Sequence, residues 1–198
     1  MRDTPHPGDH RPALTGIPPR IVGVGSPHGN DRLGWEIAMA LAHPLAGLAP
    51  EIRCCDRPGA LLLEELDGAE LAFIIDAMTA GLRPGSIRCF TPAALFQAAG
   101  RGASSRSVPD AMAGLAGGAA PRLSSHGFGV VEALQLGRLL DRLPARLYVL
   151  GVETGEAAAP VDVTQASAEA ARLIMAKARR RDLRGEESAN MTKRGGTA

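Results

Sequence analysis

The chain alternates between short, continuous apolar runs and longer stretches in which apolar residues recur every three or four positions. Short segments at residues 20–25, 51–56, 71–76, 86–90 and 145–152 predict strands, and the continuous apolar run at 71–76 is typical of a central strand that is covered on both faces. The recurring positions, such as Ile37, Leu41 and Leu45, predict helices at 34–49, 61–66, 92–99, about 125–143 and 163–181. We therefore expect an α/β fold of three layers, in which a mostly parallel, twisted sheet of about five strands carries helices on both faces.

Three segments lack any apolar period. Residues 1–19 are polar and rich in proline, which predicts a flexible leader. Residues 100–122 are rich in Gly, Ala and Ser and predict a flexible insert, and residues 182–198 predict a disordered, polar tail. The expected organisation is therefore one α/β domain over residues 20–181.

Composition narrows the function classes. Lys and Arg total 22 against 21 for Asp and Glu, so the formal net charge of +1 gives no attraction to nucleic acid or to an anionic membrane surface. The sequence contains no run of about 18 apolar residues, so no membrane span is predicted. The three cysteines form no disulfide framework, which favours a reducing, cytoplasmic compartment. The oligomeric state is left open.

Acidic residues gather where the predicted strands end. Asp31 follows the first strand, Asp56 and Asp76 end the second and third, and Glu153 follows the last. Ligands of an open parallel sheet bind beyond the carboxyl ends of its strands, and His126, just ahead of a predicted helix, could face the same edge. Asp31, Asp76 and His126 together make a candidate metal triad, for which zinc, nickel, iron and manganese cannot be ranked by sequence.

Each of these residues also has a purely structural interpretation. Asp31 could cap the helix that follows it, Asp76 could be a solvated strand end, and His126 could be a helix cap or a packed ring. Asp56 is better explained as the start of a turn, and Glu153 could be either structural or functional. Other chemistry has weaker support: Gly23 and Gly25 begin a dinucleotide-like pattern whose third glycine is replaced by His28, and no P-loop, HExxH or G-x-S-x-G motif is present.

Four blocks in order resemble the hydrogenase maturation proteases. The first, GVGSPHGNDRLG at residues 23–34, is similar to their glycine-rich opening, and the second, DAMTAGLRPGSI at 76–87, to their Asp-Ala strand end and Pro-Gly turn. The third, LSSHGFG at 123–129, resembles their Ser-x-His helix start, and the fourth, LYVLGVE at 147–153, their last strand. Departures include Ser26 and Asn30 in the first block and Arg-Pro-Gly-Ala after Asp56, where the family tends to have Gly-Thr-x-Gly.

The resemblance implies a phosphorylase/hydrolase-like fold and a cytoplasmic bacterial endopeptidase. Family members remove a C-terminal peptide from the nickel-loaded precursor of the hydrogenase large subunit, which would be the partner here. The family's metal-facing triad falls on Asp31 (if one residue of the preceding loop is deleted), Asp76 and His126. These residues would be both catalytic and metal-binding. The nickel would be supplied by the precursor, and zinc or another divalent metal could bind in vitro.

Two other functions remain open. A protein of the same fold could bind a metallated partner as a chaperone without cleaving it, which the changed turn after Asp56 keeps in play. Peptidyl-tRNA hydrolases share a similar first turn, but this chain lacks their Arg-His-Asn-like segment and any strongly basic balance. No Ser or Cys with a convincing base is visible, which disfavours a covalent mechanism.

Overall fold

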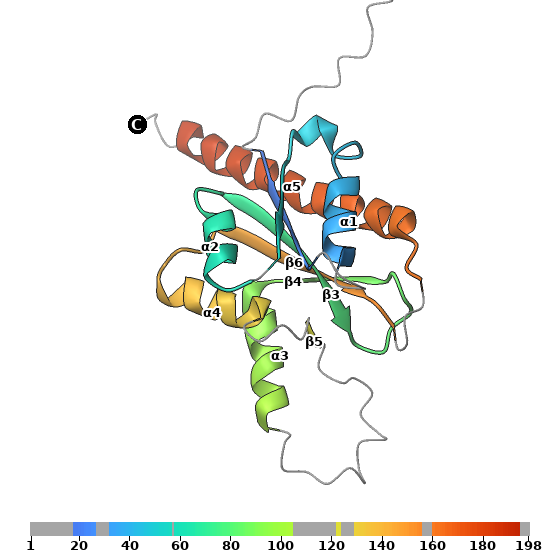
Figure 1. Cartoon of the computed structure of the whole chain (residues 1–198). Helices are drawn as coiled ribbons and strands as arrows, with labels where there is room; N and C mark the ends of the chain where they lie inside the picture. The colour runs from blue at the N-terminus through green and yellow to red at the C-terminus, as the bar shows by residue number, and fades with distance from the viewer. Residues whose placement is uncertain are drawn as a thin grey trace, which may run out of the picture.

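A computed structural model describes residues 18–26, 32–56, 58–104, 122–123, 129–155 and 160–194 (Figure 1). The strands are β1 (Arg20–Val24), β2 (Glu51–Cys55), β3 (Leu71–Thr79), β4 (Ile87–Phe90), β5 (Arg122–Leu123) and β6 (Arg146–Glu153). The helices are α1 (Leu33–Ala40), η2 (Ala46–Leu48), α2 (Ala60–Leu66), α3 (Pro92–Ser104), α4 (Val130–Leu139) and α5 (Val163–Arg194).

The sheet has the order β2-β1-β3-β6-β4. Strands β1, β2, β3 and β6 are parallel, and β4 runs antiparallel to β6. The link from β3 to β4 contains no helix that could return the chain to the start of the sheet, so β4 runs in the opposite direction. The mostly parallel α/β fold predicted from the sequence is confirmed.

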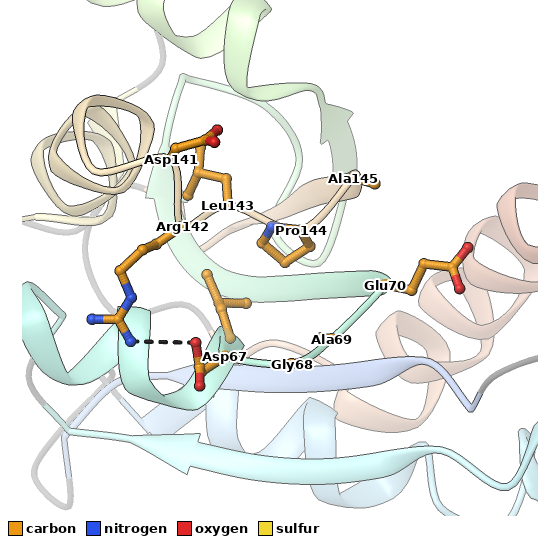
Figure 2. A pocket seen from close by; sticks show the side chains of 10 residues that line it. Asp67, Gly68, Ala69, Glu70, Asp141, Arg142, Leu143, Pro144 and Ala145 are labelled. Carbon is orange, nitrogen blue, oxygen red and sulfur yellow. Dashed lines mark hydrogen bonds and ion pairs between the residues drawn. The ribbon is translucent and has the colours of Figure 1, made fainter.

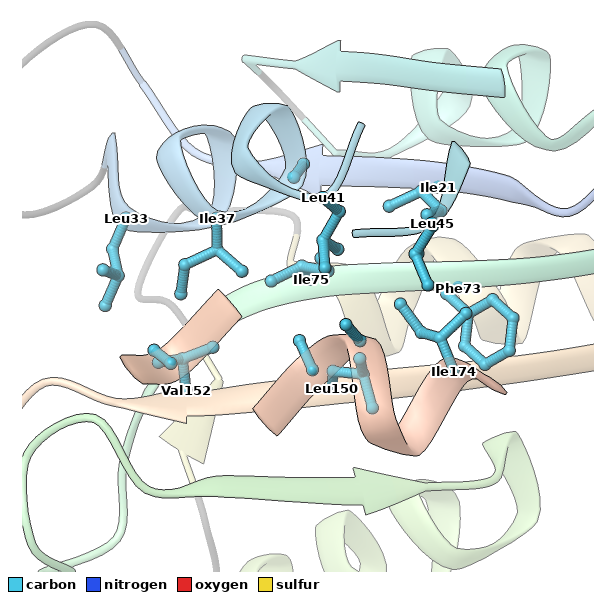
Figure 3. Packing of buried hydrophobic residues seen from close by; sticks show 14 of the residues in the cluster. Ile21, Leu33, Ile37, Leu41, Leu45, Phe73, Ile75, Leu150, Val152 and Ile174 are labelled. Atoms are coloured by element: carbon cyan, nitrogen blue, oxygen red, sulfur yellow. The ribbon is translucent and has the colours of Figure 1, made fainter. Parts of the chain in front are cut away.

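Helices cover both faces of the sheet. On one face, α1 and α5 pack on side chains that include Ile21, Phe73, Ile75 and Leu150 (Figure 3). On the other face, α2, α3 and α4 pack on the alternate positions, which include Val22, Ile74 and Val149. No helix in the described ranges is long and apolar enough to cross a membrane.

Several helix boundaries differ from those expected. Helix α4 is shorter than the expected helix at about 125–143. Helix α1 ends at Ala40, because Pro44 has no N–H to donate to the carbonyl of Ala40. Helix α3 continues to Ser104, into the predicted insert, and α5 continues to Arg194, into the predicted disordered tail. The tail is polar but rich in Arg, Glu, Ala and Lys, which have high helix propensity, so polarity alone was a poor guide to its structure.

Candidate functional site

Asp76 lies inside strand β3 rather than at its end, because β3 continues to Thr79. It is fully buried, with 0% of its surface exposed. Its neighbours at alternate positions, Ala72 and Ile74, pack under α2 and α4, so strand alternation directs Asp76 to that face of the sheet. A carboxylate with no exposed surface is not the solvated strand end that was the structural alternative.

The other two predicted ligands, Asp31 and His126, lie outside the described residues. The described residues next to them on the chain are nevertheless well placed. Gly34, three residues after Asp31, packs so tightly on the ends of β1 and β3 that an added Cβ would lie 2.1 Å from the carbonyl oxygen of Val24 and 2.6 Å from that of Ile75. The start of α1 therefore rests on the residue that precedes Asp76.

Strand β5 approaches the same part of β3. Met78 pairs with Glu153 of β6 on one side and with Leu123 of β5 on the other. Since β6 occupies one side of β3, β5 must lie along the side that β1 occupies further back, where the pairing of β1 with β3 ends at Ile75. Asp76 and Ala77 thus lie between the end of β1, which leads to Asp31, and β5, which leads to His126.

Next to Asp76, the sheet face is apolar. The residue paired with Asp76 on β6 is Gly151, and an added Cβ there would lie 2.6 Å from the sulfur of Met78 and 3.3 Å from Cε2 of Phe90. Met78, itself 1% exposed, therefore fills the space over Gly151. Met78 was not among the predicted site residues, although its position two residues after Asp76 puts both on one face of the strand.

Glu153 has a structural role in this structure. Its carboxylate is fully buried and accepts hydrogen bonds from the backbone N–H groups of Ala80 (2.7 Å), Leu82 (3.3 Å) and Gly155 (3.0 Å). It thereby fastens the segment after β3 to the end of β6. Of the two interpretations of Glu153, the structural one accounts for these three hydrogen bonds.

No group of three or more His, Cys, Asp and Glu that could hold a metal ion occurs within the described residues. Because that set contains Asp76 but neither Asp31 nor His126, the triad stays a prediction. The thiols of Cys54 and Cys89 are poor nucleophiles, because burial raises both pKa values and the charge of Glu65 raises that of Cys54 further.

A pocket of about 450 Å³ opens at the other end of the sheet, where the parallel strands begin (Figure 2). It lies between the segment that leads into β3 and the one that leads into β6, and an ion pair of 3.3 Å between Arg142 and Asp67 spans it. Ligands of parallel sheets bind at the carboxyl ends of the strands, whereas this pocket lies at their amino ends. The pocket and Asp76 are therefore separate features.

Neither a protein-family model nor a curated protein matches the sequence. Among solved structures, the chain is similar to the hydrogenase maturating endopeptidase HybD from E. coli, with a TM-score of 0.51 and 19% identity over 83% of this chain and 93% of HybD. The NiFe hydrogenase maturation protease HycI from Thermococcus kodakarensis has a TM-score of 0.49 and 16% identity, over 84% of this chain and 96% of its own. The likeness to HybD shows that the predicted resemblance holds at the level of the fold.

Proposed function

We propose that this protein is a cytoplasmic, metal-directed endopeptidase that removes a C-terminal peptide from the nickel-loaded precursor of a hydrogenase large subunit. Asp31, Asp76 and His126 face the metal that the precursor brings. One observation carries the proposal: β1 and β5 approach the same edge of β3 on either side of Asp76. The fold shared with HybD, which is named a hydrogenase maturating endopeptidase, supports a substrate that belongs to hydrogenase maturation.

Chain lengths allow the three side chains to meet. Asp31 lies three residues before Gly34, and His126 three residues after Leu123. An extended chain of that length spans at most about 11 Å, so both residues stay within reach of the strand segment that holds Asp76. Two carboxylates and an imidazole are donors that suit nickel as well as zinc, iron or manganese, so the proposed donor set fits the metal.

The chain's own contribution would be to hold the metal and to exclude water from one side of the site. Asp76 is paired with Gly151 of β6, its other side lies between the pairings of β3 with β1 and with β5, and it has no exposed surface, so its position needs little rearrangement when the metal arrives. Met78 and Gly151 close the apolar side of the site. A bound divalent metal would polarise the scissile carbonyl toward attack by water.

Incubation of the purified full chain with a nickel-loaded large-subunit precursor tests the proposal, with mass spectrometry to detect the released peptide. We expect cleavage by the wild type and by Asp56→Asn, a matched acid at the end of β2 that the triad does not use. We expect no cleavage by Asp76→Asn, and no cleavage of the nickel-free precursor by any variant. Binding of the nickel-loaded precursor without cleavage would favour the chaperone-like alternative. Cleavage by Asp76→Asn at the wild-type rate would contradict the triad.

A further inference from the structure

Strand β2 is an edge of the described sheet, and its hydrogen-bonding groups alternate in direction. The N–H of Glu51 donates to Pro19, and the carbonyl of Cys55 accepts from Gly25, so these residues bond toward β1. In a parallel ladder, the intervening residues then direct their N–H and C=O groups away from β1. Ile52 and Cys54 therefore present their backbone groups at the outer edge.

The charges on this edge are symmetric about Ile52. Glu51 and Arg53 flank it on the same face of the strand, with 46% and 44% of their side chains exposed. If a second β2 paired antiparallel with its centre at Ile52, each Glu51 would lie opposite an Arg53. A register centred on Arg53 would instead place two arginines opposite each other. Charged edge strands usually repel their copies, whereas this arrangement is self-complementary in one register.

Apolar side chains flank β2 on both faces of the sheet. Met39 of α1 is 62% exposed and Leu61 of α2 is 48% exposed. Met39 lies one turn after Trp35, whose indole N–H donates to the carbonyl of Cys55 (3.1 Å), and Leu61 lies one turn before Glu65, which pairs with Arg53 (3.2 Å). Residues four apart share one side of a helix, so both apolar side chains lie on the side that faces β2. Helices α1 and α2 cover opposite faces of the sheet (Figure 1).

We propose that β2 pairs antiparallel with β2 of a second copy of this chain, centred on Ile52, to form a homodimer with one continuous sheet. The two Ile52 residues exchange backbone hydrogen bonds, and the N–H of each Cys54 donates to the carbonyl of Pro50 in the other copy. The ion pairs of Glu51 with Arg20 (2.6 Å) and of Arg53 with Glu65 (3.2 Å) are then joined into one network across the interface. Met39 and Leu61 add apolar contacts on either side. This inference is independent of the proposed peptidase activity.

Sedimentation velocity of the full chain tests the dimer, with circular dichroism to confirm that each variant folds. We expect a wild-type dimer and a dissociation constant at least about tenfold higher for Arg53→Glu, which opposes like charges twice. The double variant Glu51→Arg/Arg53→Glu should recover part of the affinity lost in Arg53→Glu, because it restores opposite charges between the copies while it places like charges beside Arg20 and Glu65. Arg172→Glu, on an exposed part of α5 far from β2 in the chain, serves as the control. A monomeric wild type, or a charge swap that fails to recover dimerisation while folded, would overturn the proposal.

Cross-linking tests the register. In a background of Cys54→Ser, Ile52→Cys places two thiols at a hydrogen-bonded antiparallel pair, where Cα atoms are about 5.5 Å apart and a disulfide fits. Arg53→Cys places them two residues out of register, beyond that reach. We expect a disulfide dimer only for Ile52→Cys under mild oxidation. Equal cross-linking of both variants would overturn the proposed register, and protection of the Cys54 amide from exchange in a monomer would show that another segment of the same chain covers the edge.

Discussion

Gly23 of strand β1 and Gly34 of helix α1 face each other at a backbone-to-backbone contact. A Cβ added to Gly23 would lie 2.5 Å from the carbonyl oxygen of Gly34. Any side chain at either position would therefore push helix and strand apart. The contact fixes where α1 begins relative to the ends of β1 and β3. It therefore places the start of α1 beside Ile75, the residue that precedes Asp76.

Gly34→Ala should destabilise the fold strongly. The added methyl group would lie 2.1 Å from the carbonyl oxygen of Val24, and because backbone atoms cannot swing aside, α1 must move. We expect a loss of about 3 kcal/mol in the free energy of unfolding, measured by urea denaturation.

Gly47→Ala is the matched control, since an added Cβ there meets nothing within 4 Å. It should change the free energy of unfolding by less than about 0.5 kcal/mol. Equal stabilities of the two variants would show that the contact between α1 and the strands is looser than the structure indicates.

Local sequence patterns predicted every described strand except β5, and the acidic residues near the strand ends, but not the long-range contacts. The apolar run before Asp76 predicted a central strand, and β3 is central. The run could not show that β3 continues to Thr79, because that extension depends on pairing with Glu153 of β6 and with β5, far along the chain.

The same limit applies to the candidate site. Asp76 was identified from its place after an apolar run, but its complete burial is a result of packing. The role of Glu153 could not be decided from sequence, because its partners are backbone N–H groups, among them that of Ala80, and every residue type except proline supplies such a donor. The structure shows its role, because the pairing of β6 with β3 brings the carboxylate of Glu153 within hydrogen-bond distance of the N–H of Ala80.

Glu153→Gln should loosen the segment that follows β3. The carboxylate accepts three backbone N–H groups, whereas an amide offers one oxygen and directs its NH₂ group at a donor. We expect a loss of about 2 kcal/mol and faster hydrogen exchange at the amides of Ala80 and Leu82. Glu132→Gln, an exposed change on α4, should affect neither; unchanged exchange in Glu153→Gln would remove the fastening role.

Met78 and Gly151 should be energetically coupled. Gly151→Ala places a methyl group 2.6 Å from the sulfur of Met78 and should cost about 1–2 kcal/mol. Met78→Ala leaves a cavity and should cost about 2–4 kcal/mol. In the double variant, the new methyl group occupies part of that cavity, so its cost should fall below the sum by at least about 0.5 kcal/mol. Additive costs in urea denaturation would mean that the two residues do not share the space beside Asp76.

Nickel and zinc titrations of the isolated chain bear most directly on the triad. If Asp31, Asp76 and His126 hold a metal together, calorimetry should show binding by the wild type and at least about tenfold weaker binding by Asp76→Asn and by His126→Ala, because each loses one of three donors. Asp56→Asn, an acid at the end of β2 that lies outside the triad, should bind like the wild type, and all variants should keep their melting temperatures within a few degrees. Unchanged affinity in Asp76→Asn would remove the buried carboxylate from the metal site. A wild type that binds neither metal would mean that the nickel arrives only with the precursor, and the cleavage assay would then carry the test of Asp76.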